Sequence, residues 1–443
     1  MRNDIIIMTL FLWGMFRVFS HVHVGIYLWT WISLMSPHTM QWGRTSGIPF
    51  SMIIAGSTLA ALFTSKDPRQ RIWSPEMTLI LIHLAWVGMT TYFAINASGA
   101  WKEFDRFWKI QLFTVLAVAL LTDRDKLDKF IWIVAASIGF YGVKGGIFTI
   151  LTAGNSRVWG PAGSFIEGNN EMAMANLMVL PLFFYLLGIQ KNEWIKRGIV
   201  LSIALNVFSI IGSQSRGAML GMLAIGGFFW LKSRSKVKSL LLVLILGGTV
   251  ASFMPQAWWD RMNTVKTHDQ DASAMGRINA WVVALRVAND HLIGGGANVF
   301  TPRIFQQYAP VPEDWHDVHS IYFEQIGEQG WIGFVLYFSI YALAWFRCSR
   351  IIRRYKNDPD KKWAASLAAM VQVGIIGFMA AGAFLGLSYW DLPFDLIVIA
   401  LVLSKILEQE QEDAAQASRP VSKAAALAAT RGNGRRATPP ASG

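Results

Sequence analysis

Apolar residues follow one another in long, continuous runs along this chain and do not alternate with polar residues. Many of the runs reach the ~20 residues with which a helix crosses a bilayer. Only helices and closed barrels satisfy every backbone hydrogen bond in lipid, and unbroken runs are typical of helices. The pattern therefore predicts an all-α, polytopic membrane protein. We expect 12 or 13 transmembrane helices, at roughly residues 4–19, 22–36, 47–64, 76–95, 106–121, 127–150, 170–188, 197–213, 216–231, 237–254, 320–346, 364–387 and 391–407.

Basic residues mark one side of the predicted membrane, because Lys and Arg collect in short loops between the apolar runs. The positive-inside rule assigns three of these loops, near residues 66–71, 232–238 and 347–362, to the cytoplasm. Thirteen crossings place the amino terminus outside, whereas twelve keep both ends inside. The run 4–36 is broken by polar residues and fits a hairpin or a partial span, so both counts stay open. Alternation puts these loops on the outer side: 37–46, 96–105, 151–169, 213–216, 255–319 and 388–390.

The chain divides into four predicted regions. These are a membrane bundle (1–254), an outer loop region that holds most candidate functional residues (255–319), further membrane helices (320–407) and a cytoplasmic tail (408–443). Long loops in compact domains are usually functional. Within this loop, Ala280–Leu292 has apolar residues at helical spacing and predicts a short amphipathic helix that a glycine run ends. The tail is rich in Ala, Gln, Ser, Pro and Arg, so we expect it to be disordered.

Composition narrows the chemistry. The net charge of +12 does not indicate a nucleic-acid partner, because the basic residues flank membrane spans, where they also attract anionic lipids. The single cysteine, Cys348, excludes an internal disulfide and a cysteine-based metal site. Asp269 and Asp271 form the one acidic pair of the outer loop; such pairs bind divalent ions in many sugar transferases, but a solvated loop is the commoner case. We therefore expect a site without metal or cofactor.

Arg216 is the first residue that indicates anion binding. Ser215 can cap the following helix, and Arg216 would then lie in its first turn, where the helix dipole repels a cation. An arginine at a helix amino terminus suits a phosphate or diphosphate; the alternative is an anchor for lipid headgroups. Arg277 and Arg157 are further candidates on the same predicted side, although a loop arginine is more often simply solvated.

His319 is the candidate proton acceptor. It directly precedes an apolar run, so we expect it in the first turn of a helix, and arginines nearby would lower its pKa and keep it neutral. His316 is the weaker candidate of the two, and a lone histidine is more often structural. Glu324 would orient His319 or cap the helix. Glu167 and Asn169 lie in a polar, glycine-bearing segment at the entrance of another span, where capping is an equally good explanation.

Several short motifs follow one another in an order that resembles the O-antigen ligase and polymerase superfamily. They are Ser-Arg-Gly-Ala at 215–218, Gly-Arg-x-x-x-Trp at 276–281, Gly-Gly-Gly at 294–296, His-Ser at 319–320 and Gly-Glu-Gln-Gly at 327–330. The amino-terminal half is similar to the branch known as O-glycosylation ligases, through Trp31–His38 and Gly139–Gly146. Arg157–Pro161 and Asp271–Arg277 are similar to the same branch. The resemblance covers nearly the whole chain except the tail.

This resemblance implies a GT-C-like, metal-independent, inverting glycosyltransferase at the periplasmic face of the bacterial inner membrane. The donor would be a glycan on undecaprenyl diphosphate, and the acceptor a sugar hydroxyl of lipid A-core, as in lipopolysaccharide synthesis. Arg216 and Arg277 would hold the diphosphate, and His319 would be the base. The family has about twelve helices, so a count of thirteen would depart from it.

Three alternatives stay open. A polymerase of the same superfamily would use a second lipid-linked glycan as acceptor, and a protein O-glycosylating ligase would use a protein. A transporter of lipid-linked glycans belongs to another class. Transporters tend to carry charges at mid-membrane and repeated halves, whereas here the candidate charges lie in outer loops and no internal repeat is visible.

Overall fold

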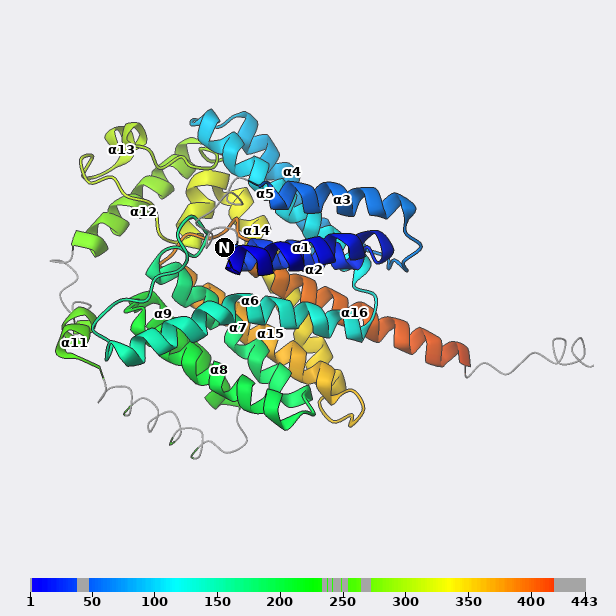
Figure 1. Cartoon of the computed structure of the whole chain (residues 1–443). Helices are drawn as coiled ribbons and strands as arrows, with labels where there is room; N and C mark the ends of the chain where they lie inside the picture. The colour runs from blue at the N-terminus through cyan, green and yellow to red at the C-terminus, as the bar shows by residue number, and fades with distance from the viewer. Residues whose placement is uncertain are drawn as a thin grey trace, which may run out of the picture.

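The computed structural model describes residues 2–37, 48–232, 254–263 and 272–417, together with residues 237, 241 and 248. None of these residues forms a strand. The helices, labelled as in Figure 1, are α1 (Arg2–Ser20), α2 (His23–Met35), α3 (Phe50–Thr64), α4 (Pro75–Tyr92), α5 (Ala97–Leu120), α6 (Arg124–Leu151), α7 (Asn169–Ile189), α8 (Glu193–Gly212), α9 (Arg216–Lys232), α11 (Gln256–Asn263), α12 (Ala272–Asp290), α13 (Pro302–Tyr308), α14 (Ile321–Tyr355), α15 (Lys362–Gly382) and α16 (Asp391–Ala417).

Five of the described helices are long and apolar enough to cross a membrane, namely α6, α7, α8, α14 and α15. Shorter apolar helices span Ile7–Ser20, Phe50–Thr64 and Arg216–Leu231. The prediction of an all-α, multi-pass membrane protein is thus confirmed. The number of 12 or 13 spans and the outer position of the long loop stay predictions.

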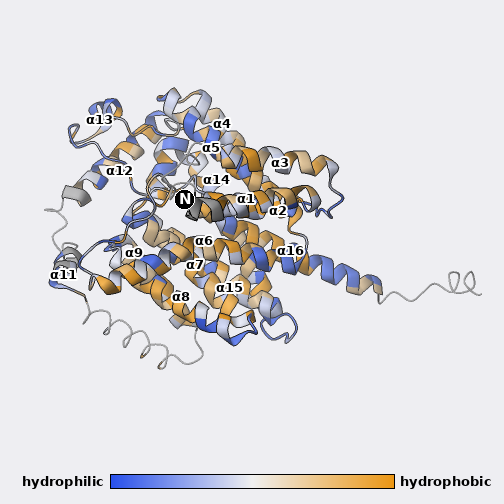
Figure 2. Cartoon of the chain, viewed as in Figure 1, coloured by the Kyte–Doolittle hydropathy of each residue, from blue (hydrophilic) through white to orange (hydrophobic). Residues whose placement is uncertain are grey.

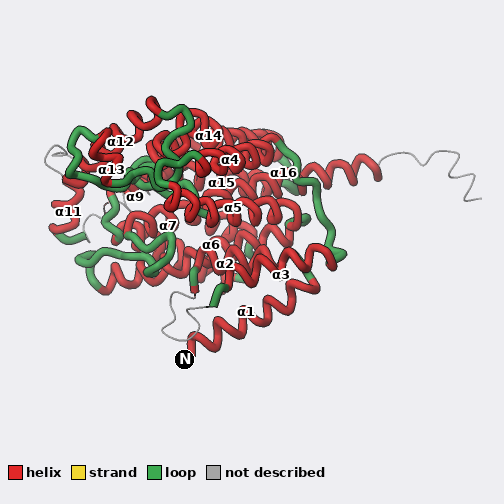
Figure 3. The backbone as a smooth tube through the Cα atoms, turned by 90° about the horizontal axis from the view of Figure 1, so that it is seen from above, coloured by secondary structure: helices red, strands yellow, loops and turns green. Residues whose placement is uncertain are grey.

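The core of the bundle surrounds α7 and the first half of α16, which are buried along most of their length. Helix α15 packs against α7, α9, α14 and α16, while α6 packs against α7 and α8. Figure 2 shows orange, apolar ribbon throughout this bundle. Helices α11, α12 and α13 gather at one end of the molecule, and the last part of α16 projects from the opposite end (Figures 1 and 3).

Two predicted boundaries are wrong. Helix α12 begins at Ala272, earlier than the predicted Ala280, and ends at Asp290. Helix α16 continues to Ala417, into the predicted disordered tail. Glutamate, glutamine and alanine dominate that extension, and these residues favour helix without any tertiary contact. Four predicted features lie wholly or mostly outside the described residues: the rest of the tail (418–443), the acidic pair Asp269 and Asp271, most of the predicted outer loop 37–46, and most of the predicted span 237–254.

Helix α14 is broken, although the sequence predicts one span over 320–346. Gly330 has φ +65° and ψ −178°, which separates a short leading segment from the long apolar one. The glycine turn 294–296 crosses at this point, where the Gly295 and Gly296 amides donate to the carbonyls of Gly327 and Glu328, each at 2.9 Å. A side chain at position 330 would meet the amide nitrogen of Gly294 at 2.8 Å. The leading segment, which carries several buried polar residues, is thereby separated from the long apolar segment of α14.

Candidate active site

The turn between α8 and α9 positions Arg216. Ser215 caps α9, because the amide of Ala218 donates to its Oγ at 3.2 Å, as the sequence predicts. Gln214 adopts a left-handed conformation with φ +56°. Two of the predicted residues hold this turn from outside. The side-chain amide of Asn169 donates to the carbonyl of Ser213 at 2.8 Å, and Nε of Arg157 donates to Gln214 at 3.4 Å.

The segment that leads into α7 is stabilised by its own side chains. Glu167 accepts a hydrogen bond from the amide of Gly163 at 2.8 Å, and its carbonyl accepts one from the amide of Gly160 at 2.9 Å. Glu167 therefore braces a loop. Glu171, in the first turn of α7, interacts electrostatically with Arg277 and Asp317. The amino end of α7 thus joins the Arg216 turn to the histidine segment.

His319 lies in the loop before α14 and is not part of the helix, which corrects the prediction that it occupies the first helical turn. Its φ is +43°, in the left-handed region that side chains other than glycine rarely adopt. Ser320 precedes the first helical residue, Ile321. The indole of Trp281 donates to the carbonyl of Val318 at 3.0 Å and fixes the backbone just before His319. Backbone strain of this kind is often found at functional sites, where it fixes the orientation of a side chain.

Three charged or titratable groups surround the His319 ring. Its Nδ1 lies 3.6 Å from a carboxylate oxygen of Asp317, and Arg277 and His316 interact with it electrostatically. Burial is the largest cause that lowers the pKa of His319 below its ordinary 6.5. The positive charges of Arg277 and His316 lower the pKa further, while Asp317 opposes them. The direction agrees with the sequence prediction, but burial outweighs the arginine.

His316 has its own partners. Its Nδ1 lies 3.2 Å from Asp314, and its ring covers Gly276, where an added Cβ would stand 2.9 Å from the ring. Arg277 follows Gly276 directly. Both histidines and this arginine therefore belong to one cluster.

Aromatic packing links the Arg216 turn to this cluster. Gly217, next to Arg216, faces Phe384, whose ring centroid lies 6.4 Å from that of Trp281. Trp281 lies one helical turn beyond Arg277 on α12. The two candidate arginines thus stand at either end of one packed aromatic pair.

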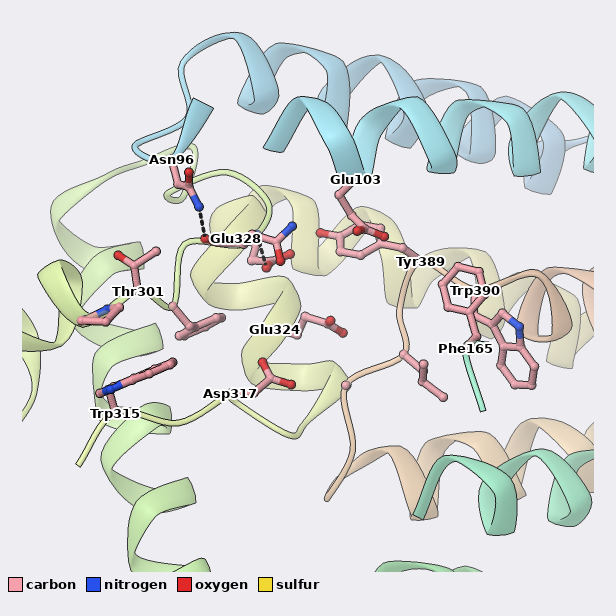
Figure 4. Close-up of a pocket in the computed structure, with 15 residues that line it drawn as sticks. Asn96, Glu103, Phe165, Thr301, Trp315, Asp317, Glu324, Glu328, Tyr389 and Trp390 are labelled. Carbon is pink, nitrogen blue, oxygen red and sulfur yellow. Dashed lines mark hydrogen bonds between the residues drawn. The ribbon is translucent and has the colours of Figure 1, made fainter. Parts of the chain in front are cut away.

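A cavity of about 480 Å³ opens beside Asp317 (Figure 4). Four carboxylates line it, from Glu103 on α5, Asp317, and Glu324 and Glu328 on the leading segment of α14. In Figure 4, Trp315 borders one side, and Trp390 with Phe165 borders the other. Asn96, Asn298, Phe300, Thr301, Pro302, Gly386, Leu387 and Tyr389 complete the lining.

Backbone and side-chain donors hold the two glutamates of α14. Glu324 accepts from the hydroxyl of Ser388 at 2.6 Å and from its amide at 3.1 Å, so it does not orient His319. Glu328 accepts from the amide of Asn298 at 2.7 Å. Burial and these two carboxylates raise the pKa of the neighbouring Tyr389 well above its ordinary range, so its hydroxyl stays protonated.

The predicted site residues thus separate into two groups. The structure brings Arg277, His316 and His319 together around Asp317. Four further predicted residues stabilise neighbouring backbone: Arg157 and Asn169 hold the Arg216 turn, Glu167 holds the loop before α7, and Glu324 holds the loop at Ser388. Arg216 belongs to neither group and begins α9.

Sequence reasoning missed Asp317, Glu171 and Glu103 as members of the site. Asp317 had a signal, since it lies two residues before His319; Glu103 had none. Among the described residues, no group of three or more His, Cys, Asp or Glu side chains is arranged to hold a metal ion.

Two family models match the chain. Residues 199–338 match the family described as O-antigen ligase, and residues 1–191 match a family of unknown function. No curated protein matches the chain. The first match contains Arg216, Arg277, His316, His319 and most of the acidic lining. The match over residues 199–338 supports membership of the O-antigen ligase superfamily.

Proposed function

We propose that the protein transfers a glycan from undecaprenyl diphosphate to a sugar hydroxyl of lipid A-core, by inversion and without a metal ion. The reaction would occur at the periplasmic face of the inner membrane and yield lipopolysaccharide. One observation carries the proposal: the strained, half-buried His319 interacts with both a cation, Arg277, and a carboxylate, Asp317. The family match supports the reaction type.

The transfer is a single displacement. The acceptor oxygen forms a bond to the anomeric carbon of the donor and gives its proton to His319. The bond from that carbon to the diphosphate oxygen breaks at the same time, and undecaprenyl diphosphate leaves with the electron pair. Attack from the face opposite the leaving group inverts the configuration. A positioned base contributes typically ~10²–10⁴-fold to such a step.

Arginine is suited to the leaving group. A diphosphate needs its growing negative charge stabilised and does not need a proton, and a guanidinium provides fixed positive charge with two parallel donors. Arg277 acts on His319, and Arg216 opens α9, where the helix amino terminus adds to the positive potential. The lowered pKa of His319 keeps its imidazole neutral at neutral pH, which a proton acceptor requires.

Reconstitution tests the proposal. Purified protein in lipid nanodiscs is incubated with an undecaprenyl-diphosphate glycan and lipid A-core, and products are separated by gel and mass spectrometry. We expect a ligated lipopolysaccharide with wild-type protein and none with His319→Ala. A lengthened lipid-linked glycan would reassign the protein as a polymerase, and a glycosylated protein acceptor would reassign it as a protein ligase. Movement of unchanged donor across the bilayer, with no new glycosidic bond, would identify a transporter.

The orientation has its own test. Single cysteines are introduced at Val311 and Asp360, both exposed, in a Cys348→Ala background, because Cys348 is the chain's one cysteine. In intact inner-membrane vesicles of known sidedness, we expect an impermeant maleimide to label Val311→Cys from the periplasmic side and Asp360→Cys from the cytoplasmic side. Labelling of both from the same side would overturn the periplasmic placement of the site.

A further inference from the structure

A small basic hollow lies between α14 and α16, at the end of the molecule from which the last part of α16 projects (Figure 1). Its volume is about 170 Å³. Three arginines line it, Arg347, Arg350 and Arg354, together with one carboxylate, Glu408. Nearly the whole length of α14 separates it from His319. The hollow is therefore distinct from the candidate active site.

The protein itself engages Arg347 and Glu408. Nε and Nη2 of Arg347 donate to the two carboxylate oxygens of the buried Glu76, at 2.7 and 2.6 Å. Its Nη1 donates to the hydroxyl of Ser404 at 2.9 Å and lies 3.7 Å from Glu408. Glu408 also interacts electrostatically with Lys405. Arg347 thus links α14 to α4 and α16, and its charge is balanced by carboxylates of the chain.

Arg350 and Arg354 have no such balance. They lie four residues apart on one face of α14, where like charges repel each other. Neither forms an ion pair with a carboxylate among the described residues, and Arg354 lies over the ring of Tyr355 at 5.5 Å. Residues 418–443, which follow α16, contain no Asp or Glu, so their side chains cannot supply the missing negative charge. An anion from outside the chain would relieve the repulsion.

The position of the hollow matches the depth of lipid headgroups. On α14 the first residue of its lining, Arg347, directly follows the exposed, apolar Phe346. On α16 the lining contains Leu407 and then Glu408. The predicted spans 320–346 and 391–407 end at these two points, so both helices place the hollow at the edge of the hydrocarbon layer. The basic loop 347–362 assigns this edge to the cytoplasmic side.

General attraction between basic residues and a membrane surface does not account for this arrangement. Arg353 lies on the same helix and is exposed, but it does not line the hollow. The helix dipole favours cations in the last turn of α14, and this applies to Arg353 and Arg354 alike. Two guanidinium groups at one hollow can instead share the oxygens of a phosphate. Pockets that enclose a whole small molecule measure ~300–1,000 Å³, so this one suits a single phosphate group.

We propose that Arg350 and Arg354 form a binding site for the phosphate of an anionic phospholipid in the leaflet on the predicted cytoplasmic side. The phosphate oxygens accept hydrogen bonds from both guanidinium groups, while the acyl chains stay in the bilayer beside Phe346. The site is separate from the proposed glycan transfer and does not depend on it.

Lipid binding to the full-length protein tests this. The protein is purified in detergent, stripped of lipid and titrated with phosphatidylglycerol or with zwitterionic phosphatidylcholine, and the first bound lipid is quantified by native mass spectrometry. We expect phosphatidylglycerol to bind about tenfold more tightly than phosphatidylcholine. Arg350→Ala and Arg354→Ala should each weaken the binding of phosphatidylglycerol by roughly tenfold, since each removes a charge-assisted contact. Arg350→Lys should lose less, because it keeps the charge.

Arg353→Ala is the matched control, because it removes the same charge from the same helix outside the hollow. It should leave the affinity for phosphatidylglycerol within about twofold of wild type. An equal loss in Arg353→Ala would show diffuse attraction and overturn the site, as would equal binding of the two lipids to wild type. Inorganic phosphate that displaces the lipid at a similar concentration would overturn the assignment to a lipid. Arg350 and Arg354 are exposed, so the variants should keep wild-type thermal unfolding without lipid, and Arg354→Gln repeats the test with a longer side chain.

Discussion

Two neighbouring parts of this site differ in their ionisable side chains. The segment around α9 and α12 contributes Arg216 and Arg277, whereas the cavity beside α14 is lined by Glu103, Glu324 and Glu328. His319 and Asp317 lie at the border between them. A glycosyl transfer needs the same division, because its leaving group is an anion and its nucleophile is a hydroxyl that loses a proton.

The two parts also differ in how they are held. The Arg216 turn relies on backbone capping and on braces from Asn169 and Arg157. The two glutamates of α14 lie on a helix segment that Gly330 separates from the membrane-spanning part. A donor carried by a mobile lipid can be captured by charge at a turn. An acceptor hydroxyl must be oriented toward the anomeric carbon, which requires rigidly held side chains. Substitutions in the two parts should therefore impair the reaction in different ways.

The largest effect is expected for His319→Ala. The change removes the proton acceptor but no group that contacts the diphosphate, so ligation should fall by roughly 10²–10⁴-fold. Donor affinity should stay within a factor of about two, which is the direct contrast with the arginine side. Donor binding and ligation are measured on the same nanodisc preparation. His316→Ala is the matched control and should be milder, because His316 packs on Gly276 and pairs with Asp314. Full activity of His319→Ala would mean that the base lies elsewhere.

Arg277→Ala and Arg216→Ala should each impair donor binding and turnover together. Each removes a charge-assisted hydrogen bond worth roughly 1.5–3 kcal/mol, which corresponds to about 10- to 100-fold. Lysine should rescue only in part, since it keeps the charge but lacks the planar fork. Arg303→Ala, an exposed arginine of α13 outside the cluster, is the control. Donor affinity that survives both alanine substitutions would refute the assignment of these arginines to the donor site.

The sequence predicts much of this arrangement because membrane topology sorts loops by side. Asn96, Phe165, Trp315 and Tyr389 come from four predicted outer loops, and they meet in one cavity. Local helix-capping preferences also predict that Ser215 caps α9 and that Arg216 lies in its first turn. Such features depend on hydropathy and on short-range hydrogen bonds, and both can be predicted from a single sequence.

Long-range packing accounts for what could not be predicted. Glu103 and Glu324 face one cavity, although they lie far apart in the chain and no spacing rule relates them. The sequence predicts His319 inside a helix, but the indole of Trp281 donates to the preceding carbonyl and helix α14 starts later. The break at Gly330 depends on the glycine turn 294–296, which approaches from another part of the chain. One signal was available, because Glu324 and the glutamate four residues later share a helix face.

A smaller effect is expected for Asp317→Asn, and it appears in the pH profile. His319 must be neutral to accept a proton, so activity should fall as pH drops through its pKa, which lies below 6.5. Asp317 raises that pKa, so removing its charge should lower the pKa and move the acid limb to lower pH. Arg277 lowers the pKa, so the residual activity of Arg277→Ala should show an acid limb at higher pH. Ligation rates measured from mildly acidic to mildly basic pH reveal both shifts, and limbs that move together would exclude His319 as the titrating group.

The smallest effect is expected for Glu167→Gln. Glu167 is exposed and accepts a hydrogen bond from the amide of Gly163, so it stabilises a loop. It belongs neither to the arginine segment nor to the lining of the cavity. The glutamine oxygen can still accept this bond, and the loss of charge should cost at most about 1 kcal/mol of stability. Ligation at neutral pH should stay within about twofold of wild type, with the acid limb unchanged, since Glu167 is not among the groups that perturb His319. Thermal unfolding and a pH profile of ligation are recorded side by side. A collapse of ligation without a loss of thermal stability would instead make Glu167 the carboxylate that takes the acceptor proton, and the border between donor and acceptor would then lie at the entrance of α7.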